Sequence, residues 1–151
     1  MQLHLEDCVP RIFSRTRNDW TDRFPSIIAT ALEIDARNVI LDGEIIVPNE
    51  KGGDFNAMQN SVGPKSRKLK AQHQFQAFDI MYLDGLDLRR CRLIDRKAVV
   101  EELLKDAPSY FQIVERIEGT PGPQVYRSAC GLGLAGIVSA HGWAVHLRRP
   151  H

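Results

Sequence analysis

The sequence has few cysteines, and their spacings are not those of disulfide-bonded folds or of metal sites. Its 151 residues include three, Cys8, Cys91 and Cys130, with no C-x-x-C pair and no cluster of cysteine with histidine. An odd number of widely spaced cysteines indicates neither a disulfide framework nor a zinc site. This usage favours a reducing, cytosolic setting.

Long apolar runs and an excess of one charge are also missing. No apolar run reaches the roughly 18 residues that span a bilayer, and MQLHLEDC has acids where a signal peptide is basic. We therefore expect no membrane segment. Twenty basic and nineteen acidic residues give a net charge of +1, which argues against a surface that binds nucleic acid all over. Two local basic runs, at 65–70 and 89–97, are of the kind that usually form solvated faces.

The apolar patterns predict one domain of mixed secondary structure. A chain of this length can bury a core without staples. Helix 94–105 carries an apolar stripe at positions 94, 98, 99, 103 and 104. Because strands and helices are interspersed and tight turns such as Asp84-Gly85 suggest hairpins, we expect an α+β fold with antiparallel sheets and flanking helices. The predicted strands are 2–6, 9–14, 38–48, 74–83, 110–117 and 136–139, and the predicted helices begin at Pro25 and Asp54 and cover 94–105 and 122–132.

The stretch 40-ILDGEIIVPN-49 places Asp42-Gly43-Glu44 inside an apolar run. A carboxylate in such a run costs free energy unless something pairs with it. One interpretation is that Gly43 lets a ligand approach the backbone while Glu44 accepts hydrogen bonds from a hydroxyl or pairs with a cation. The alternative is an ordinary hairpin turn at Asp42-Gly43, with Glu44 facing water.

Two further stretches have polar or aromatic residues suited to binding. Phe78 beside Asp79 could offer a flat face on which a base stacks, although the pattern alone favours Phe75 and Phe78 as core residues. In 14-SRTRNDWT-21, Arg15 and Arg17 could hold a phosphate, or the stretch could be a polar loop. None of these signals is specific by itself.

Taken in order, four blocks of the sequence resemble a known family. They are IFSRTRNDWTDRFP, ILDGEIIVPNEKGGDFNAMQNSVG, FQAFDIMYLDGLDLRRCRLIDRKAVVEELL and ACGLGLAGIVS. Together they resemble the adenylation (nucleotidyltransferase) domain of ATP-dependent DNA ligases, in particular the bacterial ligases of the non-homologous end-joining type. The resemblance covers roughly residues 5 to 139. It implies a partial adenylation domain, ATP-grasp-like, over 1–139 and a divergent C-terminal tail over 140–151.

The resemblance implies roles for individual residues. In these ligases a lysine attacks the α-phosphate of ATP, the AMP passes to a DNA 5′-phosphate, and the 3′-hydroxyl seals the nick, with Mg²⁺ or Mn²⁺ assisting. Glu44 matches the glutamate that holds the ribose, Phe78 the aromatic that stacks on adenine, and Arg15 the arginine near the nucleotide and the DNA phosphate. Asp42, Gly43 and Asp79 take supporting positions.

The sequence departs from the family pattern at the residues that do the chemistry. No K-x-D-G block, which carries the nucleophilic lysine, occurs in these 151 residues, and 51-KGGD-54 has the letters in another order. Where the family has E-G-I-V-x-K, this chain has Ala135 and Ala140. A methyl group cannot coordinate a hard cation or balance a phosphate. The resemblance therefore implies no catalytic residue and no metal ligand at these positions.

Several interpretations stay open from sequence. The chain could be a truncated DNA ligase that cannot seal DNA alone, a non-enzymatic remnant that binds adenosine nucleotide weakly, or a relative among RNA ligases and mRNA-capping enzymes. An α+β domain with coincidental motifs is the bland alternative. The family partners would be ATP and nicked or broken double-stranded DNA in the bacterial cytoplasm, with no membrane. The oligomeric state is not indicated.

Overall fold

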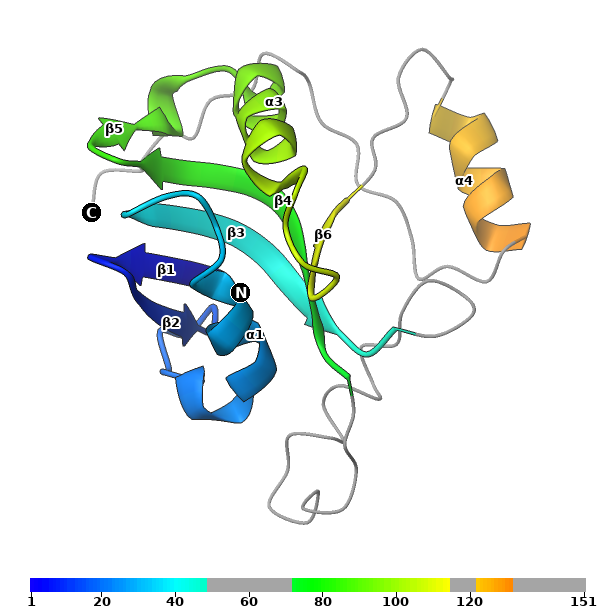
Figure 1. Ribbon diagram of the computed structural model, residues 1–151. Helices are drawn as coiled ribbons and strands as arrows, with labels where there is room; N and C mark the ends of the chain where they lie inside the picture. Colours follow the sequence, from blue (N-terminus) through cyan, green and yellow to red (C-terminus); the bar gives the residue numbers. More distant parts are fainter. Residues whose placement is uncertain (49–71, 115–121, 132–151) are drawn as a thin grey trace.

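The computed structural model describes residues 1–48, 72–114 and 122–131, and these residues form a curved sheet with helices beside it (Figure 1). The predicted helix at Asp54, the strand 136–139, the basic run 65–70 and positions Ala135 and Ala140 lie outside the described residues. The described elements are β1 (Gln2–Glu6), β2 (Val9–Phe13), η1 (Thr21–Arg23), α1 (Pro25–Ala31), β3 (Val39–Ile46), β4 (Gln74–Leu83), β5 (Leu86–Asp87), η2 (Leu88–Arg90), α3 (Leu93–Leu104), β6 (Phe111–Ile113) and α4 (Gly122–Gly131).

The six strands make one sheet of mixed direction. Its order is β2-β1-β3-β4-β5, with β6 beside β4. The expected antiparallel pairing is confirmed for every pair except β4 with β6, which is parallel. The difference has a topological cause. Between β4 and β6 the chain passes through α3, and a crossover of this length returns a strand in the same direction. The α+β class stands, with this one parallel edge.

The core lies between one face of the sheet and the helices α1 and α3. Ile27 and Ala31 of α1 and Val100 and Leu104 of α3 join the same buried cluster as the inward residues of the strands. Pro25 occupies the first helical positions of α1, where its fixed φ is compatible with a helix and its missing N–H costs nothing. Both helices lie in front of the sheet in Figure 1, and α4 is drawn to one side of it, so no described helix covers the opposite face.

The apolar stripe predicted for α3 is partly wrong. The buried residues of the helix are Arg96, Val100 and Leu104, at successive i, i+4 positions, and Val99 and Leu103 pack against the cluster from its margin. Ile94 is exposed instead. Positions 99, 103 and 104 of the predicted stripe do face the core, and Arg96 was missed because a buried arginine does not register as apolar in the sequence.

The turns at one end of the sheet are held together by Asp84. The dipeptide Asp84-Gly85 turns β4 into β5 with positive φ at both residues (40° and 97°), which confirms the hairpin turn expected there. The Asp84 carboxylate accepts hydrogen bonds from the backbone amides of Arg37 (3.0 Å) and Asn38 (2.6 Å), at the entrance to β3. This contact fastens the start of β3 to the end of β4.

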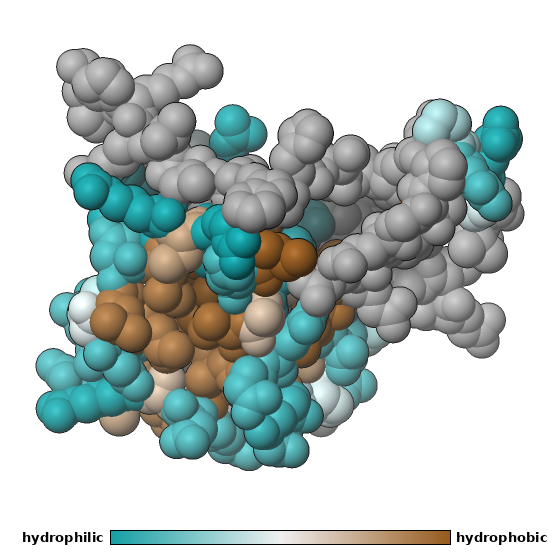
Figure 2. Space-filling model, turned by 90° about the horizontal axis from the view of Figure 1, so that it is seen from above, coloured by the Kyte–Doolittle hydropathy of each residue, from teal (hydrophilic) through white to brown (hydrophobic). Residues whose placement is uncertain are grey.

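Apolar side chains also gather on the surface. Figure 2, which views the molecule from above, shows an apolar area bordered by polar side chains. The exposed large apolar residues are Val9, Leu32, Phe78, Leu86, Ile94 and Val114. No helix within the described residues is long and apolar enough to cross a membrane. Cys8 and Cys91, the two cysteines whose side chains the structure describes, are both free thiols.

Gly43 is required by packing inside the core. The strand β3 runs through Asp42-Gly43-Glu44 without a turn, so the hairpin alternative for this triplet is wrong. A Cβ on Gly43 would lie 2.5 Å from the Phe75 ring and 2.6 Å from the Gln76 carbonyl oxygen. The space that the missing side chain leaves is therefore taken by Phe75 and the neighbouring strand. The expectation that it admits a ligand is not what the structure shows.

We predict that Gly43→Ala destabilises the fold by about 3 kcal/mol, because the added methyl overlaps a buried ring and a backbone oxygen that cannot both move away. Urea denaturation measures the free energy of unfolding. Gly85→Ala is the matched control. Nothing lies within 4 Å of a Cβ there, so its cost comes from the positive φ alone, about 1 kcal/mol. Equal losses in the two variants would contradict the packing argument.

Candidate functional site

Two of the expected binding residues lie on the face of the sheet that carries no described helix, here called the open face. In β3 the buried Leu41, Gly43 and Ile45 alternate with Asp42 and Glu44. Successive side chains of a strand point to opposite faces, so Asp42 and Glu44 share the open face. The same alternation in β1 places Gln2, the register partner of Asp42, on that face.

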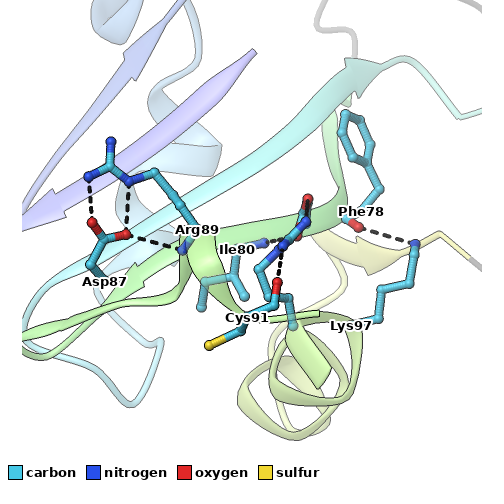
Figure 3. A network of polar contacts seen from close by, with 8 residues as sticks. Phe78, Ile80, Asp87, Arg89, Cys91 and Lys97 are labelled. Carbon is cyan, nitrogen blue, oxygen red and sulfur yellow. Dashed lines mark hydrogen bonds and ion pairs between the residues drawn. The ribbon is translucent and has the colours of Figure 1, made fainter. Parts of the chain in front are cut away.

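Phe78 lies on the open face beside a β-bulge. In the pairing of β3 with β4, Asp42 lies opposite Asp79 and Gly43 opposite Ala77, which leaves Phe78 as an extra residue. Bulges redirect side chains and are frequent beside active sites. The ring of Phe78 is 38% exposed, although its neighbours on both sides are buried. In Figure 3 the ring points away from α3.

Glu44 and Phe78 are diagonal neighbours across the two strands. Glu44 is paired in register with Gln76, and Phe78 follows Gln76 by two residues on the same strand. Diagonal neighbours of this kind are within reach of aromatic and long side chains. Glu44 is exposed and makes no hydrogen bond or ion pair to any residue that the structure describes. The carboxylate and the ring therefore present an acceptor and a flat apolar surface side by side.

Arg15 lies on a tight turn at the rim of a hollow in the open face. The Ser14 hydroxyl accepts from the Asn18 amide, the Arg17 amide donates to the Ser14 carbonyl, and Arg17 has a positive φ of 64°. The hollow has a volume of about 770 Å³. Its lining consists of Met1, Gln2, His4, Glu6, Val9, Arg11, Phe13, Ser14, Arg15, Arg17 and Asp42.

The structure thus divides the predicted residues into two neighbouring groups. Arg15 and Asp42 line the hollow, whereas Glu44 and Phe78 lie outside its lining. The groups meet at β3, where Asp42 and Glu44 are successive residues of the open face. Sequence reasoning did not single out His4 and Arg11, which also line the hollow. The alternation of side chains in the two short strands could have placed His4 and Arg11 on one face. That prediction also requires knowing that the two strands pair.

The charge on the hollow comes from arginines and carboxylates. Burial lowers the pKa of His4 below the ordinary value for histidine, and the Glu6 carboxylate partly opposes the shift. His4 is therefore neutral at pH 7 and adds no positive charge. Its Nε2 lies 3.1 Å from the Gln2 Oε1 and its ring packs edge-on against Phe13. Arg11, Arg15 and Arg17 supply the cations.

Asp79 lies under Phe78 and forms a buried ion pair with Arg96. The Arg96 Nε and Nη2 donate to the two Asp79 oxygens at 2.8 and 3.0 Å, and its Nη1 donates to the Cys91 carbonyl at 2.6 Å (Figure 3). Arg96 is 2% exposed and Asp79 5%. The interpretation of 89–97 as a solvated basic face is therefore wrong for Arg96. Asp79 is thus a buried anchor between β4 and α3, and within the described residues no buried side-chain polar atom lacks a partner.

Two further arginines of that run, Arg89 and Arg92, are paired close by in sequence. Arg89 forms a two-pronged pair with Asp87, and hydrogen bonds from Arg89 lower the Asp87 pKa (Figure 3). Arg92 does the same for Asp95 and lowers its pKa. These arginines are engaged within the domain, which makes the run a poor candidate for a nucleic-acid surface.

Metal ligands are sparse in the part of the chain that the structure describes. No group of three or more histidine, cysteine, aspartate or glutamate side chains comes together there in a way that could hold an ion. The described residues thus do not fit a resident Mg²⁺ or Mn²⁺ by themselves.

We predict that Arg96→Met costs about 3–5 kcal/mol of unfolding free energy, because it leaves the Asp79 carboxylate buried without its cation. Arg92→Met is the matched control. It breaks an exposed pair at the start of the same helix, where solvent screens the charges, and should cost far less. Urea denaturation of both variants measures the difference, and similar losses would show that the Arg96 pair is not the buried anchor described above.

Solved structures of DNA ligases share the fold of this chain. The crystal structure of the ligase domain of LigD from M. tuberculosis superimposes with a TM-score of 0.71 at 28% identity, over 89% of this chain and 42% of that chain. A mycobacterial DNA ligase D complexed with ATP and MES superimposes with a TM-score of 0.70 at 29% identity, over the same shares. The α+β fold is that of ligase adenylation domains.

The family follows from sequence. The family described as ATP dependent DNA ligase domain matches residues 1–138. A probable DNA ligase of Dictyoglomus turgidum is 33% identical over 91% of this chain, and the multifunctional non-homologous end joining protein LigD of Pseudomonas aeruginosa is 32% identical over 97%. The chain belongs to the ATP-dependent DNA ligase family. It spans 25% and 17% of the length of these two relatives.

Proposed function

We propose that this chain forms the adenosine-binding part of an ATP-dependent DNA ligase. The observation that carries the proposal is the exposed Phe78 ring of β4, which lies beside the Glu44 carboxylate of β3 on the open face. Membership of the family supports the assignment of these positions to a nucleotide. In this proposal Phe78 stacks on the base, Glu44 accepts hydrogen bonds from the ribose hydroxyls, and Arg15 faces the phosphates.

The chemistry of each group suits its proposed partner. A phenyl ring offers a flat, polarisable surface to any base, and such stacking contributes about 1–3 kcal/mol per base. An ionised carboxylate can accept from two hydroxyls at once. Arg15 has no ion-pair partner among the described residues and can donate charge-assisted hydrogen bonds to phosphate oxygens. Asp42 separates the ribose position from the arginines of the hollow.

We predict that the chain binds ATP and that Phe78→Leu weakens this binding about 5- to 30-fold, because leucine retains apolar bulk but lacks the π surface. Phe78→Trp should retain affinity. Titration calorimetry measures the dissociation constants. Glu44→Gln should weaken binding and Glu102→Gln, an exposed glutamate of α3, should not. Absence of ATP binding by the unmodified chain at millimolar concentration would reject the proposal.

The second part of the proposal is that these 151 residues do not seal DNA unaided. The family reaction begins with a lysine nucleophile, and covalent transfer requires an activated amine. The 151 residues contain no K-x-D-G, and Ala135 and Ala140 stand where the family has a glutamate and a lysine. Nucleotide binding without transfer is also what a non-enzymatic remnant would show, so the covalent step has to be measured separately from binding.

We predict no covalent adenylate on this chain. Incubation with ATP labelled at the α-phosphate and Mg²⁺ or Mn²⁺, followed by denaturation, should leave no label on the protein. An authentic family ligase treated in parallel should retain label and supplies the positive control. A stoichiometric, acid-labile adduct on this chain would contradict the prediction.

The proposed setting is that of the family. The macromolecular partner would be double-stranded DNA with a nick or break, in repair or recombination, and the nucleotide substrate ATP with Mg²⁺ or Mn²⁺. Reduced Cys8 and Cys91 agree with a bacterial cytoplasm. Residues 1–139 would act as a partial adenylation domain and 140–151 as a divergent tail.

A further inference from the structure

Two successive residues of α3 hold two successive residues of β4 at the bulge. Arg96 binds the Asp79 carboxylate through Nε and Nη2, and the Lys97 Nζ donates to the Phe78 carbonyl oxygen at 3.2 Å (Figure 3). One contact comes from a side chain that is 2% exposed and the other from a side chain at the surface. Both act on the strand from the side opposite the Phe78 ring.

The first contact locks the strand directly after the bulge. The Asp79 Oδ1 accepts from the Ile80 amide at 2.9 Å as well as from Arg96, and the third contact of Arg96, to the Cys91 carbonyl, fixes the guanidinium from the loop before α3. These contacts therefore fix the orientation of the Asp79 side chain. Arg96 and Asp79 form a bidentate salt bridge, whose geometry is more directional than that of a single hydrogen bond.

The second contact acts on the peptide group of Phe78 itself. A bulge disrupts the regular ladder and leaves its extra residue less constrained than its neighbours. A hydrogen bond from Lys97 to the Phe78 carbonyl orients that peptide, and the ring direction follows from the backbone of the same residue. The pair Arg96 and Lys97 thus determines where the exposed ring stands.

We propose that Arg96 and Lys97 are positioning residues for Phe78. From the opposite side of the sheet, they hold its ring preorganised for stacking on a base. This rests on the proposed binding of an adenosine nucleotide by Phe78. Preorganisation strengthens binding because the ring does not have to be ordered when the ligand arrives. Neither residue touches the nucleotide, and their effect is confined to the contact with the base.

Lys97→Met tests the proposal without removing the buried pair, because Lys97 is at the surface. We expect the variant to bind ATP and adenosine more weakly by the same factor, about two- to fivefold, since the lost contact acts through the base alone. Lys97→Arg, which can still donate to the carbonyl, should restore most of the affinity. Lys105→Met is the matched control on the C-cap of α3, where the lysine pairs with Glu102, and should leave both affinities unchanged.

A double-mutant cycle separates action through Phe78 from other effects. In a Phe78→Ala background Lys97→Met should cause no further loss, because the ring that it orients is gone. A loss that persists in that background, a larger loss for ATP than for adenosine, or unchanged affinity for both would overturn the proposal. A larger loss for ATP would mean that the lysine charge acts on the phosphates.

A fluorescence measurement tests the positioning of Phe78 without any nucleotide. It still applies if the unmodified chain binds no ATP, a result that would reject the proposed function but not the positioning role. Phe78→Trp places a fluorophore at the bulge, and its emission is taken as the difference from the unsubstituted chain, which contains two tryptophans. Adding Lys97→Met should increase iodide quenching of that emission and lower its anisotropy. Lys105→Met should change neither. Unchanged quenching and anisotropy on loss of Lys97 would overturn the positioning role independently of nucleotide binding.

Discussion

The pairing of β3 with β4 holds the open face together, because it places Glu44 and Phe78 beside each other on neighbouring strands. Gly43 lets the Phe75 ring pack directly against the backbone of β3, and the close approach keeps the two strands in contact where the ladder is interrupted. Phe78 still follows the regular alternation of β4, on the same face as Gln76, and the interruption comes directly after it. Beyond the bulge the alternation is lost, because Asp79, Ile80 and Met81 are all buried.

The helix α3 contributes to the site without reaching the open face. Its apolar residues Val100 and Leu104 close the core, while Arg96 carries a charge into it. A buried ion pair is weak support for stability compared with apolar packing, but it is directional. Here it ties the helix to the one strand position that follows the bulge. The helix therefore contributes to the core and also packs behind the strand that carries the candidate base-binding surface.

Much of the fold was predictable because local patterns agree with tertiary contacts. The strands at 2–6, 9–14 and 74–83, the helix from Pro25 and the turn at Asp84-Gly85 are confirmed, since alternation, a helix-start proline and turn chemistry are local properties. The parallel β6 and the burial of Arg96 were not predictable in this way. Both depend on distant partners. The β6 residues pair with β4 residues 36 positions earlier, such as Phe111 with Phe75, and Arg96 pairs with Asp79, 17 positions earlier.

The sequence by itself determined the family and the identity of the candidate ligand-binding residues, because four ordered blocks carry that information in residue type and spacing. It also determined that no K-x-D-G stands in these 151 residues. Tertiary structure decided what the glycine of Asp42-Gly43-Glu44 does, which hollow Arg15 faces and why Phe78 is exposed. Those answers depend on register, and register is set by which strands meet and how their side chains pack, not by the letters of one strand.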